Sequence, residues 1–257
     1  MNRGNPKQTS MKKVFSIICI VAGMLFCMSA TLEAKIYLVS VGISKYERNP
    51  LRLPVSDAKT LKYVYDHNGD TKSVLIIDEN ATLENVLEKV RSFFAPASEN
   101  DIVVLFFSGH GYQGGFCAYN GLLSYDAIRE AMAVSKSKNK MIFADACYSG
   151  NMRQGKKANN NNQNTMKNAN VMLFLSSRNT ETSLESSLMD NGFFTYALQR
   201  ALRGGADANR DRVITARELF NYVSKKVSTE TGGRQHPVMW GKFSNNMPVI
   251  EWRKKGN

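Results

Sequence analysis

Two apolar runs, each ending in residues suited to chemistry, constrain this chain most. The first spans residues 101–111, D-I-V-V-L-F-F-S-G-H-G, and the second spans residues 141–150, M-I-F-A-D-A-C-Y-S-G. A short apolar run that is bounded by glycines or polar residues is typical of a strand buried on both faces. We therefore expect two buried strands, one leading to His110 and the other ending beside Asp145 and Cys147.

The rest of the chain alternates apolar strand patterns with helical segments. We expect strands in 34–43, 72–78, 101–108, 139–144 and 171–176, with one or two more in 237–250. We expect helices in 54–67, 82–94, 124–133, 193–202 and 216–227, a Gly-rich segment in 109–121 and a polar, mobile loop in 151–170. Pro54 suits a first helical turn, and Thr82 is a good N-cap.

This alternation predicts an α/β fold. The expected architecture is a three-layer α/β/α sandwich, in which helices cover both faces of a mostly parallel sheet. Ligands of such sheets bind beyond the carboxyl ends of the strands. His110 and Cys147 both fall at such ends, so the order of elements favours their meeting at one edge.

The N-terminus has the three regions of a secretory signal peptide. Lys12 and Lys13 precede an apolar stretch, residues 14–28, which small residues follow up to Ala34. The stretch is shorter than the roughly 20 residues that span a bilayer, which disfavours a retained anchor. We expect residues 1–34 to be removed after Ala30 or Ala34 (with 1–10 as an upstream extension if Met11 is the start), and a periplasmic or secreted protein.

The remaining chain is predicted to be one domain, residues 35–250, with a basic tail in 251–257. The formal net charge of the full sequence is +12, but its Lys and Arg residues are scattered in small clusters. We therefore expect a solvated basic surface and no nucleic-acid partner, and no membrane partner after signal cleavage. The absence of a Cys-x-x-Cys pair or clustered histidines argues against zinc.

A thiol and an imidazole at one sheet edge can perform nucleophilic catalysis. The Cys147 thiol becomes a nucleophile when a histidine favours its thiolate form, and His110 can then protonate a leaving amine. Glycines beside His110 leave backbone N–H groups that can stabilise an oxyanion. Either residue alone would more often be structural, whereas the two motifs together are far more specific.

The two motifs, S-G-H-G at 108–111 and D-A-C-Y-S-G at 145–150, resemble those of the caspase-like cysteine peptidases, and in particular the metacaspase branch and its bacterial relatives. The resemblance extends to 42–46, 53–58 and 194–198, and so covers about residues 35–250. It implies a His110/Cys147 dyad that hydrolyses peptide bonds through an acyl-enzyme. It also implies that the backbone N–H groups of Gly111 and Cys147 hold the oxyanion.

The same resemblance implies a specificity. In metacaspase-like enzymes an acidic S1 pocket selects Arg or Lys at P1, and the matching positions here are Asp57, Ser108 and Asp145. Without the resemblance, Asp57 could simply interact with a helix dipole, while Asp145 at a buried strand end needs a partner. Tyr148 stands where metacaspases usually carry His, and no acidic cluster between 111 and 124 matches the calcium site of many metacaspases.

A separate loop, residues 207–218, has oxygen ligands at EF-hand positions. They are Asp207, Asn209, Asp211, Val213 (through its carbonyl), Thr215 and Glu218. Arg212 occupies the position where a glycine makes the sharp turn, which should weaken calcium binding. The loop is therefore either a weak calcium site or a metal-free connection between two helices, and the predicted chemistry requires no cofactor.

The loop that follows the nucleophile contains basic residues that such an enzyme could itself cleave. They are Arg153, Lys156, Lys157 and Lys167. Self-processing and an uncut linker both remain open. Two other functions also remain: a catalytically idle caspase-like module used for binding, and a clostripain- or legumain-like peptidase with another P1 preference. The sequence predicts no oligomeric state.

Overall fold

A six-stranded sheet forms the centre of the computed structural model, which describes residues 34–112, 114–146, 171–177 and 190–252. Its strands are β1 (Ile36–Gly42), β2 (Thr71–Ile77), β3 (Ile102–Ser108), β7 (Asn139–Asp145), β8 (Val171–Leu175) and β10 (Val238–Gly241). They lie in the order β10-β8-β7-β3-β1-β2, and all pairs are parallel except β10 with β8. The mostly parallel sheet that the sequence predicts is confirmed.

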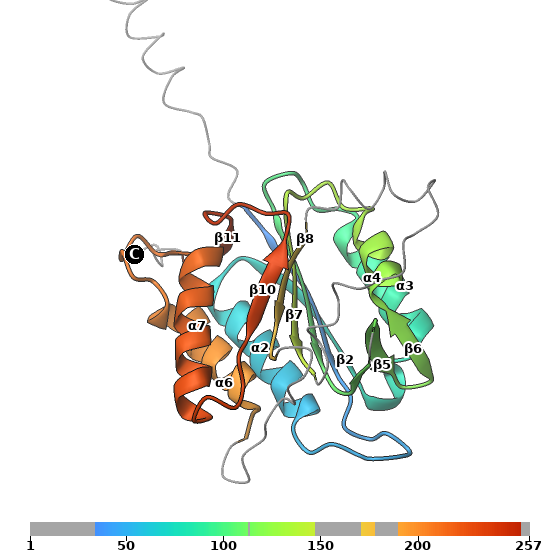
Figure 1. Cartoon of the computed structure of the whole chain (residues 1–257). Coiled ribbons are helices and arrows are strands. Elements are labelled where there is room, and N and C mark those ends of the chain that lie inside the picture. Colours follow the sequence, from blue (N-terminus) through green and yellow to red (C-terminus); the bar gives the residue numbers. More distant parts are fainter. Residues whose placement is uncertain (1–33, 113, 147–170, 178–189, 253–257) are drawn as a thin grey trace, which may run out of the picture. The chain divides into compact units, whose positions relative to one another are not determined.

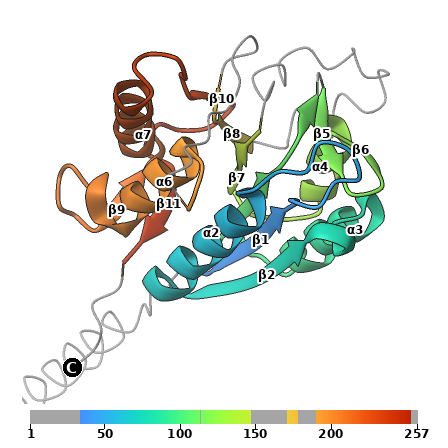
Figure 2. The same ribbon diagram turned by 90° about the horizontal axis from the view of Figure 1, so that it is seen from below.

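Helices cover both faces of this sheet, as Figures 1 and 2 show. One face packs against α2 (Pro54–Asn68), α6 (Phe193–Arg200) and α7 (Ala216–Glu230), and the other against α3 (Leu83–Phe94) and α4 (Tyr125–Met132). Along β1, Leu38 belongs to the first core cluster and Val39 to the second, because successive side chains of a strand point to opposite faces. The three-layer α/β/α architecture is therefore confirmed.

Helix starts follow local sequence chemistry. Pro54 occupies the first turn of α2, and the side chain of Thr82 accepts a hydrogen bond from the Asn85 backbone at the start of α3. Thr215 and Glu218 form a reciprocal capping box at the start of α7. Such caps satisfy backbone N–H groups that have no partner within the helix.

The Gly-rich segment folds further than the sequence predicts. It forms a small antiparallel sheet of β4 (Gly111–Tyr112), β5 (Gly115–Ala118) and β6 (Gly121–Ser124). Phe116 and Leu123 face each other across β5 and β6 and are buried, and Phe116 stacks on Phe107 of β3 with ring centroids 4.4 Å apart. The hairpin therefore adds to the core directly beside His110.

Three further differences concern where elements end and how short strands pair. The strand expected to reach Asp78 ends at Ile77, because Asp78 has a φ of 48° and its carboxylate accepts hydrogen bonds from the Ser44 and Lys45 backbone. It opens the short 3-10 helix η1 (Asp78–Asn80). After α6 the chain continues as a π-helical turn, η3 (Ala201–Gly205). Finally, β9 (Val213–Thr215) pairs with β11 (Pro248–Glu251) in a two-stranded sheet that the sequence did not predict.

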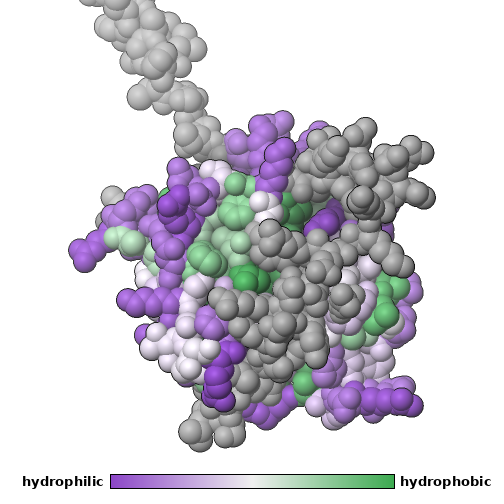
Figure 3. Space-filling model, in the orientation of Figure 1, coloured by the Kyte–Doolittle hydropathy of each residue, from purple (hydrophilic) through white to green (hydrophobic). Residues whose placement is uncertain are grey.

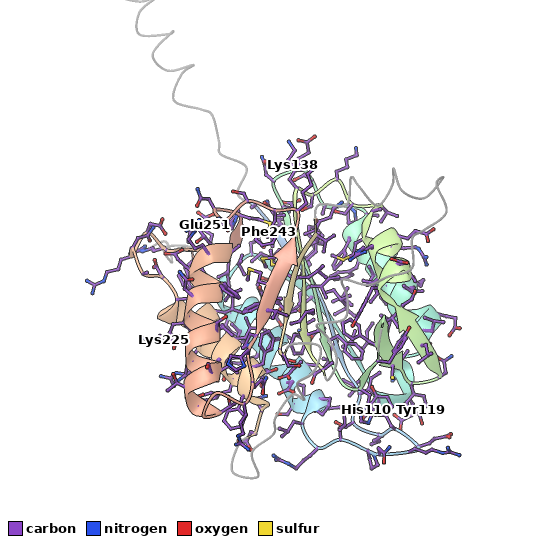
Figure 4. All side chains as sticks on the ribbon, in the orientation of Figure 1. His110, Tyr119, Lys138, Lys225, Phe243 and Glu251 are labelled. Carbon is purple, nitrogen blue, oxygen red and sulfur yellow. The ribbon has the colours of Figure 1, made fainter. Side chains whose placement is uncertain are left out.

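The carboxyl ends of the parallel strands define one edge of the molecule. Figure 4 shows His110, which follows β3, at the lower end of the sheet and Lys138, which precedes β7, at the opposite end. In Figure 3 hydrophobic residues gather on the face that carries β10, and hydrophilic residues border them above and to the left. Within the described ranges, no helix has the length and apolar character that crossing a membrane requires. The predicted signal peptide, the loop 151–170 and the basic tail lie outside those ranges, apart from residues 34, 251 and 252.

Candidate active site

His110 is held at the sheet edge by a tyrosine from the loop after β1. The His110 backbone N–H donates to Tyr46 Oη at 3.1 Å, and Tyr46 Oη donates to the Cys117 carbonyl at 2.8 Å. The two rings lie 4.6 Å apart at 47°. Gly109 permits this approach, because a Cβ at that position would come within 2.5 Å of Tyr46 Oη. Tyr46 therefore ties the histidine to the β5 hairpin.

The ring of His110 has a defined proton arrangement. Its Nε2 lies 2.7 Å from the carbonyl oxygen of Asn49. A carbonyl oxygen can only accept, so Nε2 carries a proton and Nδ1 is the nitrogen free to take up or release one. Asn49 adopts a φ of 55°, a left-handed conformation that asparagine tolerates better than most residues.

Sequence reasoning assigned no role to Tyr46 or Asn49. Tyr46 belongs to the G-I-S-K-Y motif that carried part of the family resemblance, so a signal for it existed. Burial raises the pKa of Tyr46, which keeps its hydroxyl protonated and able to donate. Asn49 acts through its backbone, and a backbone contact leaves no signature in residue type.

The three predicted S1 residues lie together at the same edge. Ser108 ends β3 and Asp145 ends β7, and the two are register partners across the parallel ladder. Asp57 lies in the first turn of α2, and Ser108 Oγ donates to its Oδ2 at 2.8 Å. All three side chains are buried. The structure thus brings Asp57, Ser108 and Asp145 together, and their role in an S1 pocket remains a prediction.

The start of α6 supplies further hydrogen bonds to the two carboxylates. Asn191 Nδ2 and the Gly192 backbone N–H donate to Asp57 Oδ1 at 2.9 Å and 3.1 Å. Thr195 donates to Asp145 Oδ2 through its backbone N–H at 3.1 Å and its hydroxyl at 2.8 Å. A Cβ at Gly192 would lie 2.5 Å from Asp145 Oδ2, so a side chain there would displace the Asp145 carboxylate. Carboxylates are favoured at such a helix N-terminus.

These donors are all neutral groups, and the two acids still repel each other. Burial raises the pKa of Asp57 to about 8, and the negative charge of Asp145 adds to this effect. The hydrogen bonds from Asn191, Ser108 and Gly192 act in the opposite direction without offsetting it. A cationic group placed beside both carboxylates would be stabilised and would favour their ionised forms.

Several predicted site residues cannot be placed in this constellation. Gly111 begins β4 directly after His110, but Cys147, the other predicted oxyanion donor and the nucleophile, lies outside the described residues. The same holds for Arg153, Lys156, Lys157 and Lys167. The described chain stops at Ala146, which is buried one residue past β7.

The EF-hand-like loop directs several of its oxygens at its own backbone. Asp207 Oδ2 accepts from the Arg212 N–H at 3.1 Å, and Asp211 Oδ1 accepts from the Val213 N–H at 2.8 Å. Glu218 is engaged with Thr215 in the capping box of α7. In the part of the chain that the structure describes, no three His, Cys, Asp or Glu residues are grouped to hold a metal ion. Calcium binding therefore remains a prediction.

Comparisons with known proteins identify the family and the fold. The profile of the caspase domain family matches residues 37–247, and the chain belongs to that family. Caspase-1 from Spodoptera frugiperda superposes with a TM-score of 0.61 and 14% identity, covering 87% of this chain and 92% of that chain. Protein GSU0716 from Geobacter sulfurreducens superposes with a TM-score of 0.61 and 15% identity, covering 82% and 94%. These structural likenesses establish the fold. No curated protein sequence matches the chain significantly.

Proposed function

We propose that this protein is a cysteine endopeptidase that cleaves peptide bonds after Arg or Lys. The observation that carries the proposal is the pair of buried carboxylates, Asp57 and Asp145, beside the strand that leads to His110. Burial and mutual repulsion disfavour the ionised form of Asp57, and a basic P1 side chain beside the two acids would favour it. Membership of the caspase domain family supports peptidase chemistry.

The proposed reaction uses His110 and Cys147 in two stages. His110 Nδ1 takes the thiol proton, and the thiolate attacks the scissile carbonyl carbon. The backbone N–H groups of Gly111 and Cys147 stabilise the oxyanion. The imidazolium then protonates the leaving amine as the C–N bond breaks, which leaves a thioester. Water next gives a proton to Nδ1 and attacks the thioester, which releases the acid and the thiolate. The Asn49 carbonyl keeps the ring oriented through Nε2 throughout.

The acidic pocket argues for one branch of the family over others. A guanidinium can bind two carboxylates through several charge-assisted hydrogen bonds, whereas an aspartate at P1 would be repelled. An asparagine at P1, as a legumain-like enzyme prefers, would bring no positive charge to the two carboxylates. We therefore place the protein in the metacaspase-like branch, in agreement with its sequence motifs.

Export and self-processing belong to the same proposal. The basic, apolar and small-residue regions of residues 1–34 support export to a periplasm or beyond the cell. Arg153, Lys156, Lys157 and Lys167 follow the nucleophile closely and match the proposed specificity. Intact-mass analysis of wild type and Cys147→Ala tests self-cleavage, because fragments common to both would exclude it.

Fluorogenic peptides that differ only at P1 provide the decisive test. We expect wild-type protein to release the fluorophore after Arg and Lys, with far slower release after Asn or Asp. Cys147→Ala and His110→Ala should abolish turnover. Wild type without turnover, with calcium or with EGTA, would favour the idle binding module instead. Preferred cleavage after Asn would indicate a legumain-like enzyme and contradict the role given to the two acids.

A further inference from the structure

The ladder between β7 and β8 ends in an unusual way, immediately before the predicted nucleophile. The Ser176 N–H donates to the Ala144 carbonyl at 2.9 Å, as in a regular parallel ladder. The next rung would join the Ala146 N–H to the Ser176 carbonyl, since parallel rungs are evenly spaced. Instead, the Ala146 N–H donates to Ser176 Oγ at 3.2 Å. The Ser176 hydroxyl thus takes the acceptor position that the Ser176 carbonyl would have in a regular ladder.

A glutamine from the segment before β10 donates a hydrogen bond to the Ser176 carbonyl. Gln235 Nε2 donates to the Ser176 carbonyl at 2.9 Å, and the Gln235 side chain is fully buried. Gln235 is itself fixed, because its backbone N–H donates to Thr231 Oγ1 at 3.1 Å just after α7. The register of β10 with β8 holds the following residues in place. The hydrogen bonds that Ser176 makes in place of the regular rung therefore depend on the C-terminal part of the domain.

The Ser176 hydroxyl makes a second contact with the same residue. It donates to the Ala146 carbonyl, with an oxygen-to-oxygen distance of 3.2 Å. One side chain therefore holds both the N–H and the C=O of Ala146, and both residues are buried. Because a peptide unit is planar, fixing the Ala146 carbonyl also fixes the plane of the peptide that joins Ala146 to Cys147. The N–H of that peptide is the predicted oxyanion donor.

We infer that Ser176 and Gln235 are positioning residues for the catalytic centre. Ser176 sets the direction of the Cys147 N–H through the Ala146 carbonyl. Gln235 keeps the Ser176 carbonyl from accepting the Ala146 N–H, so that the regular ladder between β7 and β8 ends before Ala146. This role rests on the proposed peptidase function, because it concerns the donor that stabilises the oxyanion. Loss of a single oxyanion donor costs about 10²–10³ in kcat, so a donor that is merely tilted should cost about 10-fold or more.

The test uses a matched pair at Ser176, in the full-length protein. Ser176→Thr and Ser176→Val add equal bulk to the buried site and differ in the hydroxyl alone. We expect kcat for a P1-Arg peptide to be at least about 10-fold higher in the Thr variant, with KM values within about threefold. Alkylation of Cys147 by iodoacetamide needs no oxyanion donor, so its rate should be similar in the two variants.

Gln235→Leu provides an independent variant if bulk at Ser176 prevents folding. It should lower kcat and leave KM and the alkylation rate close to wild type. Equal kcat values in the Thr and Val variants, or a Gln235→Leu protein with wild-type kcat, would overturn the positioning role. Parallel losses of kcat and alkylation would show a purely structural effect and would also overturn it. A wild-type protein without turnover would instead remove the proposed function itself.

Discussion

Replacing Asp57 by asparagine should stabilise the protein at neutral pH and at the same time impair cleavage after arginine. Asparagine has the same shape, and its Oδ1 can still accept from Asn191 Nδ2 and the Gly192 N–H. Its Nδ2 can donate to the Ser108 hydroxyl in place of the present bond. The hydrogen bonds are therefore largely retained. What leaves the pocket is an acid that, next to Asp145, must either hold a proton at neutral pH or carry a buried negative charge.

The sign of the effect follows from the raised pKa of Asp57. The folded state retains a proton that the unfolded state releases, so stability falls as pH rises from about 4 to about 8. Each unit of difference between the folded and unfolded pKa is worth about 1.4 kcal/mol, which puts the upper limit of the effect at about 6 kcal/mol. We expect Asp57→Asn to gain about 2–4 kcal/mol at pH 8 and close to nothing at pH 4, because relaxation around a buried charge reduces its cost.

Urea unfolding of wild type and Asp57→Asn at pH 4, 6 and 8 measures this difference. Asp126→Asn on α4 is the control, since the Asp126 side chain is 42% exposed and should show little change. In the same proteins, kcat/KM for a P1-Arg peptide should fall about 30-fold or more in Asp57→Asn, while a P1-Asn peptide is affected less. A destabilised Asp57→Asn protein at pH 8, or an equal gain at pH 4 and pH 8, would refute the reasoning.

The remaining predictions concern pH, the histidine and the EF-hand-like loop. KM for a P1-Arg peptide should fall as pH rises from 6 to 8, because binding the guanidinium requires the proton to leave Asp57. Steady-state kinetics should show no such trend in Asp57→Asn. A wild-type KM that does not change with pH would contradict the coupling between binding and the ionisation of Asp57. Tyr46→Phe removes the acceptor of the His110 N–H and the donor to the Cys117 carbonyl, so kcat should drop about 10-fold; unchanged kcat would show that the ring contact alone suffices. Arg212 has a φ of 72°, so Arg212→Gly should raise stability by about 1 kcal/mol in thermal unfolding. Running that scan with CaCl₂ and with EGTA tests calcium binding, and a lower melting temperature for the glycine variant in EGTA would argue against strain at this position.

Much of the fold could be predicted because its signals are local. The β3 and β7 runs are apolar on both faces, and a strand with that pattern has to be covered on both sides. Helix starts at Pro54 and Thr82 depend on neighbours within one turn. The β4–β6 hairpins could not be predicted in the same way, since glycines interrupt their alternation. The burial of Phe116 and Leu123 and the stacking of Phe116 on Phe107 show why that segment is ordered, and both require the tertiary structure.

For the candidate site, the sequence by itself determined which residues could act and at which strand ends they stand. Ser108, His110, Asp145 and the backbone up to Ala146 follow from two short motifs and the direction of parallel strands. Their partners come from remote segments, such as Asn191, which is 134 positions from Asp57. The tertiary structure alone decided that Tyr46 holds His110 and that the Ser176 hydroxyl replaces its own carbonyl. The physical reason is that residue type determines which groups can donate or accept a hydrogen bond. Which donor meets which acceptor depends on how the whole chain packs.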